Sequence, residues 1–183
     1  MTTPGKHTNR PARDALALLR AEHDKVRSLF LEFDSLRGID DEDERKSELV
    51  DEICYELTLH TMIEEEIFYP VLRSAIDDDD MMDEADVEHA GARELISQLE
   101  VMYPGDDHFD ATVVVLGEEV GHHIEKEEGE MFDAARNAGI DLVRLGEQLA
   151  ARRAELEEDL AAPATSIDAI EPHAGRRPPR PPN

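Results

Sequence analysis

The sequence predicts an all-α protein, an up-down-up-down four-helix bundle with an additional C-terminal helix. Three observations lead to this prediction. Apolar residues recur at alternating spacings of three and four in five segments, which is the spacing of one helix face. Ala, Leu, Glu, Asp and Arg dominate the composition and favour helix over strand. The connections between the first four segments are a few residues long, so neighbouring helices must run antiparallel.

The five expected helices follow one another along the chain. They are residues 13–37, 43–76, 79–103, 107–137 and 140–160. We expect Pro70 to kink the second helix, because proline lacks a backbone N–H and its ring clashes with the preceding turn. Pro104 and Gly105 should end the third helix, and Gly139 should cap the fourth.

Each of the first four helices has one apolar face that should point into the bundle. On the first two helices these faces are Leu16, Leu19, His23, Val26, Phe30 and Phe33, then Leu49, Ile53, Leu57, His60, Glu64, Ile67 and Val71. On the next two they are Met82, Ala85, His89, Ala92, Ile96, Leu99 and Tyr103, then Val113, Leu116, Val120, His123, Glu127, Met131 and Ala134. The fifth helix should lie against the bundle through Leu142, Leu145, Leu149 and Leu156.

The five helices are expected to form one domain, residues 13–160. A polar N-terminal lead, residues 1–12, and a Pro-rich tail, residues 161–183, flank this domain and are expected to be disordered. His7 and His173 lie in these flanking segments and are not expected to bind a ligand.

The net charge of −26 disfavours nucleic acid and anionic membranes as partners, because phosphate groups repel an acidic surface. No apolar run reaches the roughly 18 residues that a membrane-spanning helix needs. The N-terminal residues lack a hydrophobic signal region, which favours a cytoplasmic protein.

The single cysteine, Cys54, has no internal disulfide partner and is expected to be a buried structural thiol. The oligomeric state is not specified by these patterns.

Polar residues interrupt each of the four apolar faces. Each face contains one histidine, and two faces also contain a glutamate four residues later, on the same side of the helix: the residues are His23, His60, Glu64, His89, His123 and Glu127. The four-residue spacing alone is weak evidence, because chance gives about two acidic residues at that distance from eight histidines. The information lies in the core position of all six residues on four different helices.

The six residues are expected to meet in one layer. Each of the four histidines lies about 20–25 Å along its helix from the same end of the bundle. A buried carboxylate costs several kcal/mol unless it is paired or bound to metal. A pair of metal ions would take two histidines each, share both carboxylates, and leave positions open for an oxo or hydroxo bridge and an exogenous ligand. Histidine and carboxylate ligands without thiolate suit iron, manganese or zinc.

Other histidines and tyrosines are weaker candidates. His122 lies off the apolar face, and His108 lies at the corner between the third and fourth helices, where it should be solvated. Tyr55 is five residues before His60, and Tyr69 is five residues after Glu64. Five residues turn an α-helix well away from the starting face, so direct ligation by either tyrosine is awkward, and packing is the favoured role.

The order of these residues resembles the hemerythrin HHE cation-binding domain. The resemblance rests on His23, HTMIE at 60–64, His89 and HIEKE at 123–127, and on the strings EEEIFYP at 64–70 and HHIEKEEGEMF at 122–132. It covers about residues 13–160. It implies a non-haem site with two iron ions, Fe2+ or Fe3+, and reactivity with dioxygen, hydrogen peroxide or nitric oxide.

Two positions depart from the oxygen-carrying members of that family. These have a fifth histidine four residues after the third-helix histidine, where this chain has Arg93, and an aspartate as second bridge, where it has Glu127. The chain is therefore similar to the bacterial four-histidine, two-glutamate type. Two functions stay open: reaction with small oxidants, with catalase-like peroxide decomposition as one form, or a non-catalytic sensor or iron reservoir acting through a protein partner. No catalytic residue is identified beyond the ligands.

Overall fold

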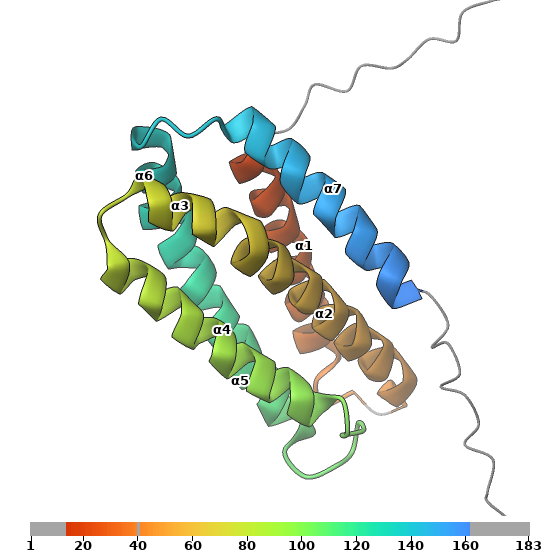
Figure 1. Cartoon of the computed structure of the whole chain (residues 1–183). Coiled ribbons are helices and arrows are strands. Elements are labelled where there is room, and N and C mark those ends of the chain that lie inside the picture. Colours follow the sequence, from red (N-terminus) through yellow and green to blue (C-terminus); the bar gives the residue numbers. More distant parts are fainter. Residues whose placement is uncertain (1–13, 40, 162–183) are drawn as a thin grey trace, which may run out of the picture.

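The computed structural model describes residues 14–39 and 41–161. The expected lead at residues 1–12 and the expected tail from residue 162 onward, with His7 and His173, lie outside this part of the chain. Within the described residues every regular element is a helix, which confirms the predicted all-α class (Figure 1).

Four antiparallel rods form the bundle. The first is α1 (Ala15–Leu36), and the second runs through α2 (Asp43–Ile63), η1 (Glu64–Phe68) and α3 (Tyr69–Ala75). The third is α4 (Asp79–Leu99), and the fourth runs through α5 (Phe109–Lys126), η2 (Glu127–Met131) and α6 (Phe132–Asn137). Helix α1 packs against α2 and α5, and α4 packs against the same two helices, so the four rods close into a ring.

The additional C-terminal helix is α7 (Leu142–Ala161), which lies along α1, α2 and η1 on the outside of the ring (Figure 1). Its apolar face buries Leu145, Leu149 and Leu156 against the bundle, as expected, whereas Leu142 is only partly buried. Each buried leucine of this kind contributes roughly 1.5–3 kcal/mol of hydrophobic free energy.

Two π-helical turns interrupt the second and fourth rods, and neither was predicted. In η1 the Tyr69 N–H donates to the Glu64 carbonyl, and in η2 the Phe132 N–H donates to the Glu127 carbonyl. Pro70 was expected to kink the second helix. Instead the irregularity falls just before it as a π turn; the fourth rod has the same kind of turn before Asp133, so a proline is not required for it. In Figure 1, α2 and α3 continue in nearly the same direction.

Each π turn adds one residue and rotates the helix face that follows. Phe68 and Leu72 are therefore buried in place of the expected Ile67 and Val71, which are only partly buried. In the fourth rod Phe132 and Ala135 are buried in the same way, and the expected Ala134 is partly buried. A pattern search that assumes the α-helical period misses this shift.

Three other expectations from the sequence were wrong in detail. Tyr103 is 71% exposed, because α4 ends at Leu99. Leu29, rather than Phe30, provides the buried contact of α1. Cys54 is partly buried rather than buried, although burial still raises the pKa of its thiol to about 12 and keeps it protonated.

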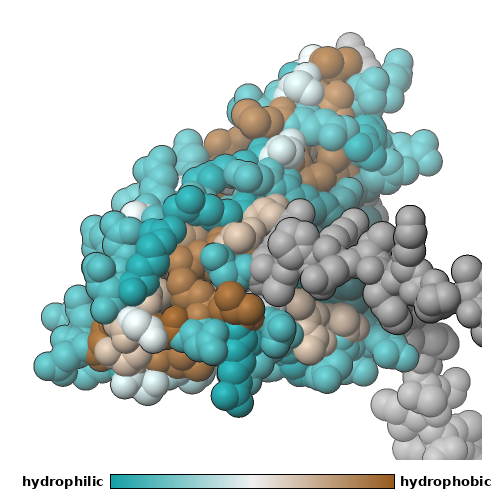
Figure 2. All heavy atoms as spheres, turned by 90° about the horizontal axis from the view of Figure 1, so that it is seen from above, coloured by the Kyte–Doolittle hydropathy of each residue, from teal (hydrophilic) through white to brown (hydrophobic). Residues whose placement is uncertain are grey.

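The buried apolar residues form two clusters, one toward each end of the bundle, with the polar layer between them. One cluster includes Leu19, Phe68 and Leu149, and the other includes Phe33 and Leu116. The face of the molecule seen from above in Figure 2 is mostly hydrophilic, with apolar patches among the hydrophilic side chains. Among the described residues, no helix is both long and apolar enough to cross a membrane.

Candidate metal centre

The structure brings all six polar core residues together in the middle of the bundle. They come from α1, α2, η1, α4, α5 and η2, and none is more than 7% exposed: His23, His60, Glu64, His89, His123 and Glu127. Their donor atoms fall into two groups, within each of which the atoms lie no more than 4.8 Å apart. The first donor group is His23, His60, Glu64 and Glu127, and the second donor group is Glu64, His89 and His123.

The four imidazoles meet through their Nε2 atoms. His23 Nε2 lies 3.2 Å from His60 Nε2, and His89 Nε2 lies 3.3 Å from His123 Nε2. Glu64 lies between the two pairs, with its Oε2 atom 3.2 Å from His60 Nε2 and 3.4 Å from His89 Nε2. Glu64 is thus the carboxylate that both donor groups share.

Each imidazole is held on its other side by a glutamate outside the centre. The distances from Nδ1 to the nearest carboxylate oxygen are 3.0 Å for His23–Glu128, 2.9 Å for His60–Glu22, 3.0 Å for His89–Glu65 and 2.8 Å for His123–Glu88. A carboxylate accepts but does not donate, so each Nδ1 carries the ring proton and each Nε2 presents a lone pair to the centre.

A basic side chain in turn holds each of these four glutamates. Arg27 binds Glu128 at 2.9 Å, Arg153 binds Glu22 at 3.1 Å, and Lys126 binds Glu88 at 2.9 Å, while Arg93 binds Glu65. Arg93, four residues after His89, supports the His89 ring from outside the centre through Glu65. Partners of this kind fix the tautomer and orientation of metal-binding histidines.

The donor set fits a bound cation, and the Tyr69 hydroxyl lies beside it, 3.1 Å from His89 Nε2 and 3.4 Å from Glu64 Oε2. With the protons on Nδ1, the Nε2 atoms of His23 and His60, 3.2 Å apart, and the Glu127 oxygen 3.0 Å from His23 Nε2 are acceptors that face one another. Glu64 Oε1 and both carboxylate oxygens of Glu127 are buried without a hydrogen-bond partner. Buried acceptors that face one another are unfavourable unless a positive charge lies between them.

The protonation of the centre points the same way. Burial, and then the charge of His123, lowers the pKa of His89 to about 4, and burial also lowers the pKa of His60. Both imidazoles are therefore neutral at pH 7, as metal binding requires. Burial, and then the neighbouring Glu127, raises the pKa of Glu64 well above its ordinary value. Without a cation, the two carboxylates cannot both stay ionised.

The centre has an approximate internal two-fold relation that was not recognised in the sequence. The dipeptide Glu-His occurs at 22–23 and 88–89, and His-x-x-x-Glu-Glu occurs at 60–65 and 123–128. In both halves the glutamate that precedes the α1 or α4 histidine accepts the Nδ1 proton of the histidine on the following rod: Glu22 binds His60, and Glu88 binds His123. The second glutamate of the longer motif accepts the Nδ1 proton of the α1 or α4 histidine: Glu128 binds His23, and Glu65 binds His89. These repeated strings were the signal for Glu22, Glu65, Glu88 and Glu128.

The remaining tyrosine and histidine candidates differ in their burial and in their distance from the centre. Tyr55 is 38% exposed and lies outside the centre, whereas Tyr69 is 3% exposed and its hydroxyl lies 3.1 Å from His89 Nε2. The expectation that five residues would turn Tyr69 away was wrong, because it assumed an α-helix and the intervening turn is π-helical. His122 and His108 are exposed, as expected.

A small enclosed cavity of about 20 Å³ lies beside the centre. All four core histidines line it, together with apolar side chains that include Val26, Ala92 and Val120. A volume of about 10–15 Å³ on this measure holds one water, so the cavity has room for a water or a diatomic molecule.

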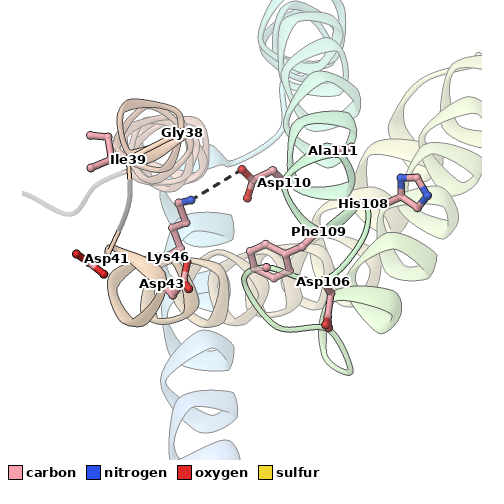
Figure 3. Close-up of a pocket in the computed structure, with 11 residues that line it drawn as sticks. Gly38, Ile39, Asp41, Asp43, Lys46, Asp106, His108, Phe109, Asp110 and Ala111 are labelled. Carbon is pink, nitrogen blue, oxygen red and sulfur yellow. Dashed lines mark ion pairs between the residues drawn. The ribbon is translucent and has the colours of Figure 1, made fainter.

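A larger hollow of about 850 Å³ lies at the far end of the bundle, between the α1–α2 and α4–α5 connections. Aspartates line much of it, and one of them, Asp110, lies 3.9 Å from the buried Lys46 (Figure 3). His108 points away from Lys46 in this view. The hollow is open and its polar groups do not converge on one point, so we do not assign the site to it.

The fold and the centre together define a class: a four-helix bundle whose core carries a buried, paired histidine–glutamate metal site. Comparison with known families agrees. The model of the hemerythrin HHE cation-binding domain matches residues 14–135, and the chain belongs to this family. It is a metal-binding, hemerythrin-like protein, which confirms the resemblance seen in the sequence.

Two relatives were found by sequence and by structure. A hemerythrin HHE cation-binding domain-containing protein from Mycobacterium kansasii superposes with a TM-score of 0.68 at 25% identity, over 80% of this chain and 89% of that one. A DNA nickase from Nostoc sp. is 30% identical over 120 residues, which are 66% of this chain and 33% of the nickase. The matching region thus spans about a third of the nickase.

Proposed function

We propose that the protein holds two iron ions and uses them to bind or react with a small oxidant: dioxygen, hydrogen peroxide or nitric oxide. The proposed ligands are His23, His60, Glu64, His89, His123 and Glu127, and the proposed cofactor includes an oxo or hydroxo bridge. The observation that carries the proposal is the pair of buried donor groups sharing Glu64, with a cavity of diatomic size against them. Iron suits a nitrogen and oxygen donor set without thiolate, in a family that binds cations.

The protein residues orient the ligands, exclude water and control protons. The four outer glutamates hold the imidazoles in the tautomer that aims Nε2 inward. The two apolar clusters keep bulk water from the layer between them. Without a cation, burial and then Glu127 raise the pKa of Glu64, so this carboxyl favours its protonated form until a cation takes the place of the proton. Bound iron would supply the change of oxidation state.

The first test is metal analysis with an optical spectrum, on full-length protein made in iron-replete medium. We expect about two irons per chain, as in other paired carboxylate centres of helical bundles, with oxo-to-iron charge transfer in the near ultraviolet. One zinc per chain from the same preparation would contradict the proposal.

Turnover is tested separately by oxygen evolution from hydrogen peroxide. Sustained evolution by the iron-loaded protein supports catalase-like decomposition. A single stoichiometric change of the optical spectrum supports binding or sensing instead.

One observation favours the alternative of a sensor or iron reservoir. Arg153 of α7 is linked to the centre by hydrogen bonds through Glu22 and His60, which gives a contact route between the metal site and a helix on the outside of the bundle. In that case iron should change the exposure of α7 to a protein partner, without turnover.

Nucleic acid is not a proposed partner, although the name of the Nostoc relative is DNA nickase. The net charge of −26 repels a phosphate backbone, and two thirds of the nickase lie outside the match. A cytoplasmic location stays a prediction from the sequence.

A further inference from the structure

The two donor groups differ in the number of sequence-predicted ligands that they contain. The first donor group has four residues and the second has three. A fourth polar atom lies at the second group, the hydroxyl oxygen of Tyr69. It is 3.1 Å from His89 Nε2 and 3.4 Å from both His123 Nε2 and Glu64 Oε2.

These distances match those between ligands of one ion. Two donors about 2.1 Å from an ion and at right angles to each other lie about 3 Å apart. The two nitrogens of the second donor group, on His89 and His123, are 3.3 Å apart. The Tyr69 oxygen is therefore spaced from these atoms as they are spaced from each other.

From this geometry we propose that Tyr69 is a metal ligand, whose phenolic oxygen completes the second donor group. The proposal rests on the two-iron function proposed above. As the oxygen binds ferric iron, the O–H bond breaks, both electrons stay on oxygen, and the proton leaves to solvent. No electron is transferred in this step.

The π turn explains how Tyr69 reaches the centre. The Tyr69 N–H donates to the Glu64 carbonyl, so the two residues are one π-helical turn apart and share a helix face. The side chain is 3% exposed, and its ring packs against His89 with centroids 5.3 Å apart. Its hydroxyl is buried and lies within 3.4 Å of donor atoms of His89, His123 and Glu64.

Phe132 occupies the corresponding place in the other half of the molecule. It follows η2 as Tyr69 follows η1, its N–H donates to the Glu127 carbonyl, and its ring stacks on His23 with centroids 6.1 Å apart. Phenylalanine has no oxygen, so the first donor group receives no phenol. The two ions would therefore differ, and the anionic oxygen donor would favour the ferric state of the ion beside Tyr69.

The test uses the full-length, iron-loaded ferric protein. A tyrosine bound to ferric iron gives a phenolate-to-iron charge-transfer band in the visible and resonance-enhanced tyrosine ring vibrations. The chain has three tyrosines, and the other two, Tyr55 and Tyr103, are 38% and 71% exposed. We expect tyrosinate vibrations in the unmodified protein, with a shift when the tyrosine rings are deuterated.

Variants then assign the signal. Tyr69→Phe should remove the visible band and the ring vibrations while the iron content stays at half the parent value or more. The matched Tyr55→Phe should keep both. If the parent protein holds its irons but lacks tyrosinate vibrations, the ligand assignment is overturned and the proposed function stands. If the parent holds no iron, both are overturned. The spectrum of the unmodified protein decides the matter even if Tyr69→Phe does not fold.

Discussion

At the scale of single residues, the contacts that orient the core histidines lie on the outer side of each imidazole ring, away from the metal centre. A glutamate accepts the Nδ1 proton of every core histidine, and this alone fixes where the Nε2 lone pairs point. With both Nε2 atoms unprotonated, two imidazole nitrogens only 3.2 Å apart, as in His23 and His60, are favourable neighbours when a cation lies close to them. The same residue types at the surface carry no such requirement.

Adjacent histidines at positions 122 and 123 allow a direct test of the ligand assignment. His123 is 7% exposed and faces the centre, whereas its neighbour His122 is exposed. We expect His123→Ala to lower iron content sharply, to about one iron per chain or less, because one donor group loses a ligand. His122→Ala should retain the parent content. Equal losses in the two variants, measured by elemental analysis, would contradict the assignment.

Glu64→Gln should have opposite effects with and without iron. In the iron-bound protein it removes a shared anionic ligand and should lower the melting temperature. In the metal-free protein it removes a buried carboxylate whose pKa is raised by burial and then by Glu127, so it should stabilise the fold. The gain at neutral pH should be on the order of a few kcal/mol, the usual cost of an uncompensated buried charge.

The pH dependence of this gain follows from the direction of the pKa shift. A carboxyl whose pKa is higher in the folded than in the unfolded protein opposes folding once it ionises. The effect is absent below the unfolded pKa of about 4.3 and grows as pH rises toward the folded value. Metal-free Glu64→Gln and parent should thus melt alike near pH 4 and diverge as pH rises, while Glu130→Gln, at an exposed position, should follow the parent throughout.

At the scale of helices, α7 does more than cover apolar surface. Arg153 binds both Glu22 and Glu56, at 3.1 and 2.6 Å, and Glu22 holds the His60 ring. The neighbouring Arg152 instead binds Glu66 and Glu155 at the surface. Two consecutive arginines of one helix therefore differ in whether they support the metal centre.

This difference predicts the effect of removing each arginine charge. Arg153→Met should weaken iron binding about ten-fold, at the lower end of the effect of losing a partner that orients a ligand, because Arg153 acts through Glu22. Arg152→Met, which removes a surface contact on the same helix, should leave affinity within about two-fold. Iron affinity is measured by competition with a chelator. An equal change in both variants would show that α7 acts only through general stability.

At the scale of the whole molecule, one polar layer lies between two apolar clusters. The clusters stabilise the ends of the bundle without any metal, because each includes residues from several helices. Without metal, the polar layer is the least stable part of the bundle, since its buried acceptors then face one another. Metal loss should loosen the middle of the molecule more than its ends.

Removal of iron should therefore lower the melting temperature without abolishing the fold. A ligand present at 100–1,000 times its dissociation constant stabilises the native state by about 3–4 kcal/mol. Hydrogen exchange should speed up most around His60 and His123, and less around Phe33 and Leu72 in the clusters. Lowering the pH should release iron, because the histidine ligands must be neutral to bind. Identical melting and exchange with and without iron would mean that the metal is not part of the core.

The sequence by itself determined the helical class, the number and order of the helices, and the six polar residues in their apolar faces. These follow from local periodicity, which a helix translates directly into faces. It also held the repeated strings around Glu22 and Glu88, whose role becomes evident only when the helices are packed. Which glutamate serves which histidine depends on the distance between rods, and neighbouring positions in the chain do not specify it.

Only the tertiary structure decided the place of Tyr69. The α-helical period turns it away from Glu64, whereas one π-helical turn brings it onto the same face. The choice between these two turns depends on the packing of Phe68 and Tyr69 in the assembled core, since the fourth rod has the same π turn with no proline after it. The spacing of apolar residues along the chain does not report that packing energy. The shift of one residue, and with it the asymmetry between Tyr69 and Phe132, therefore appears only in the folded molecule.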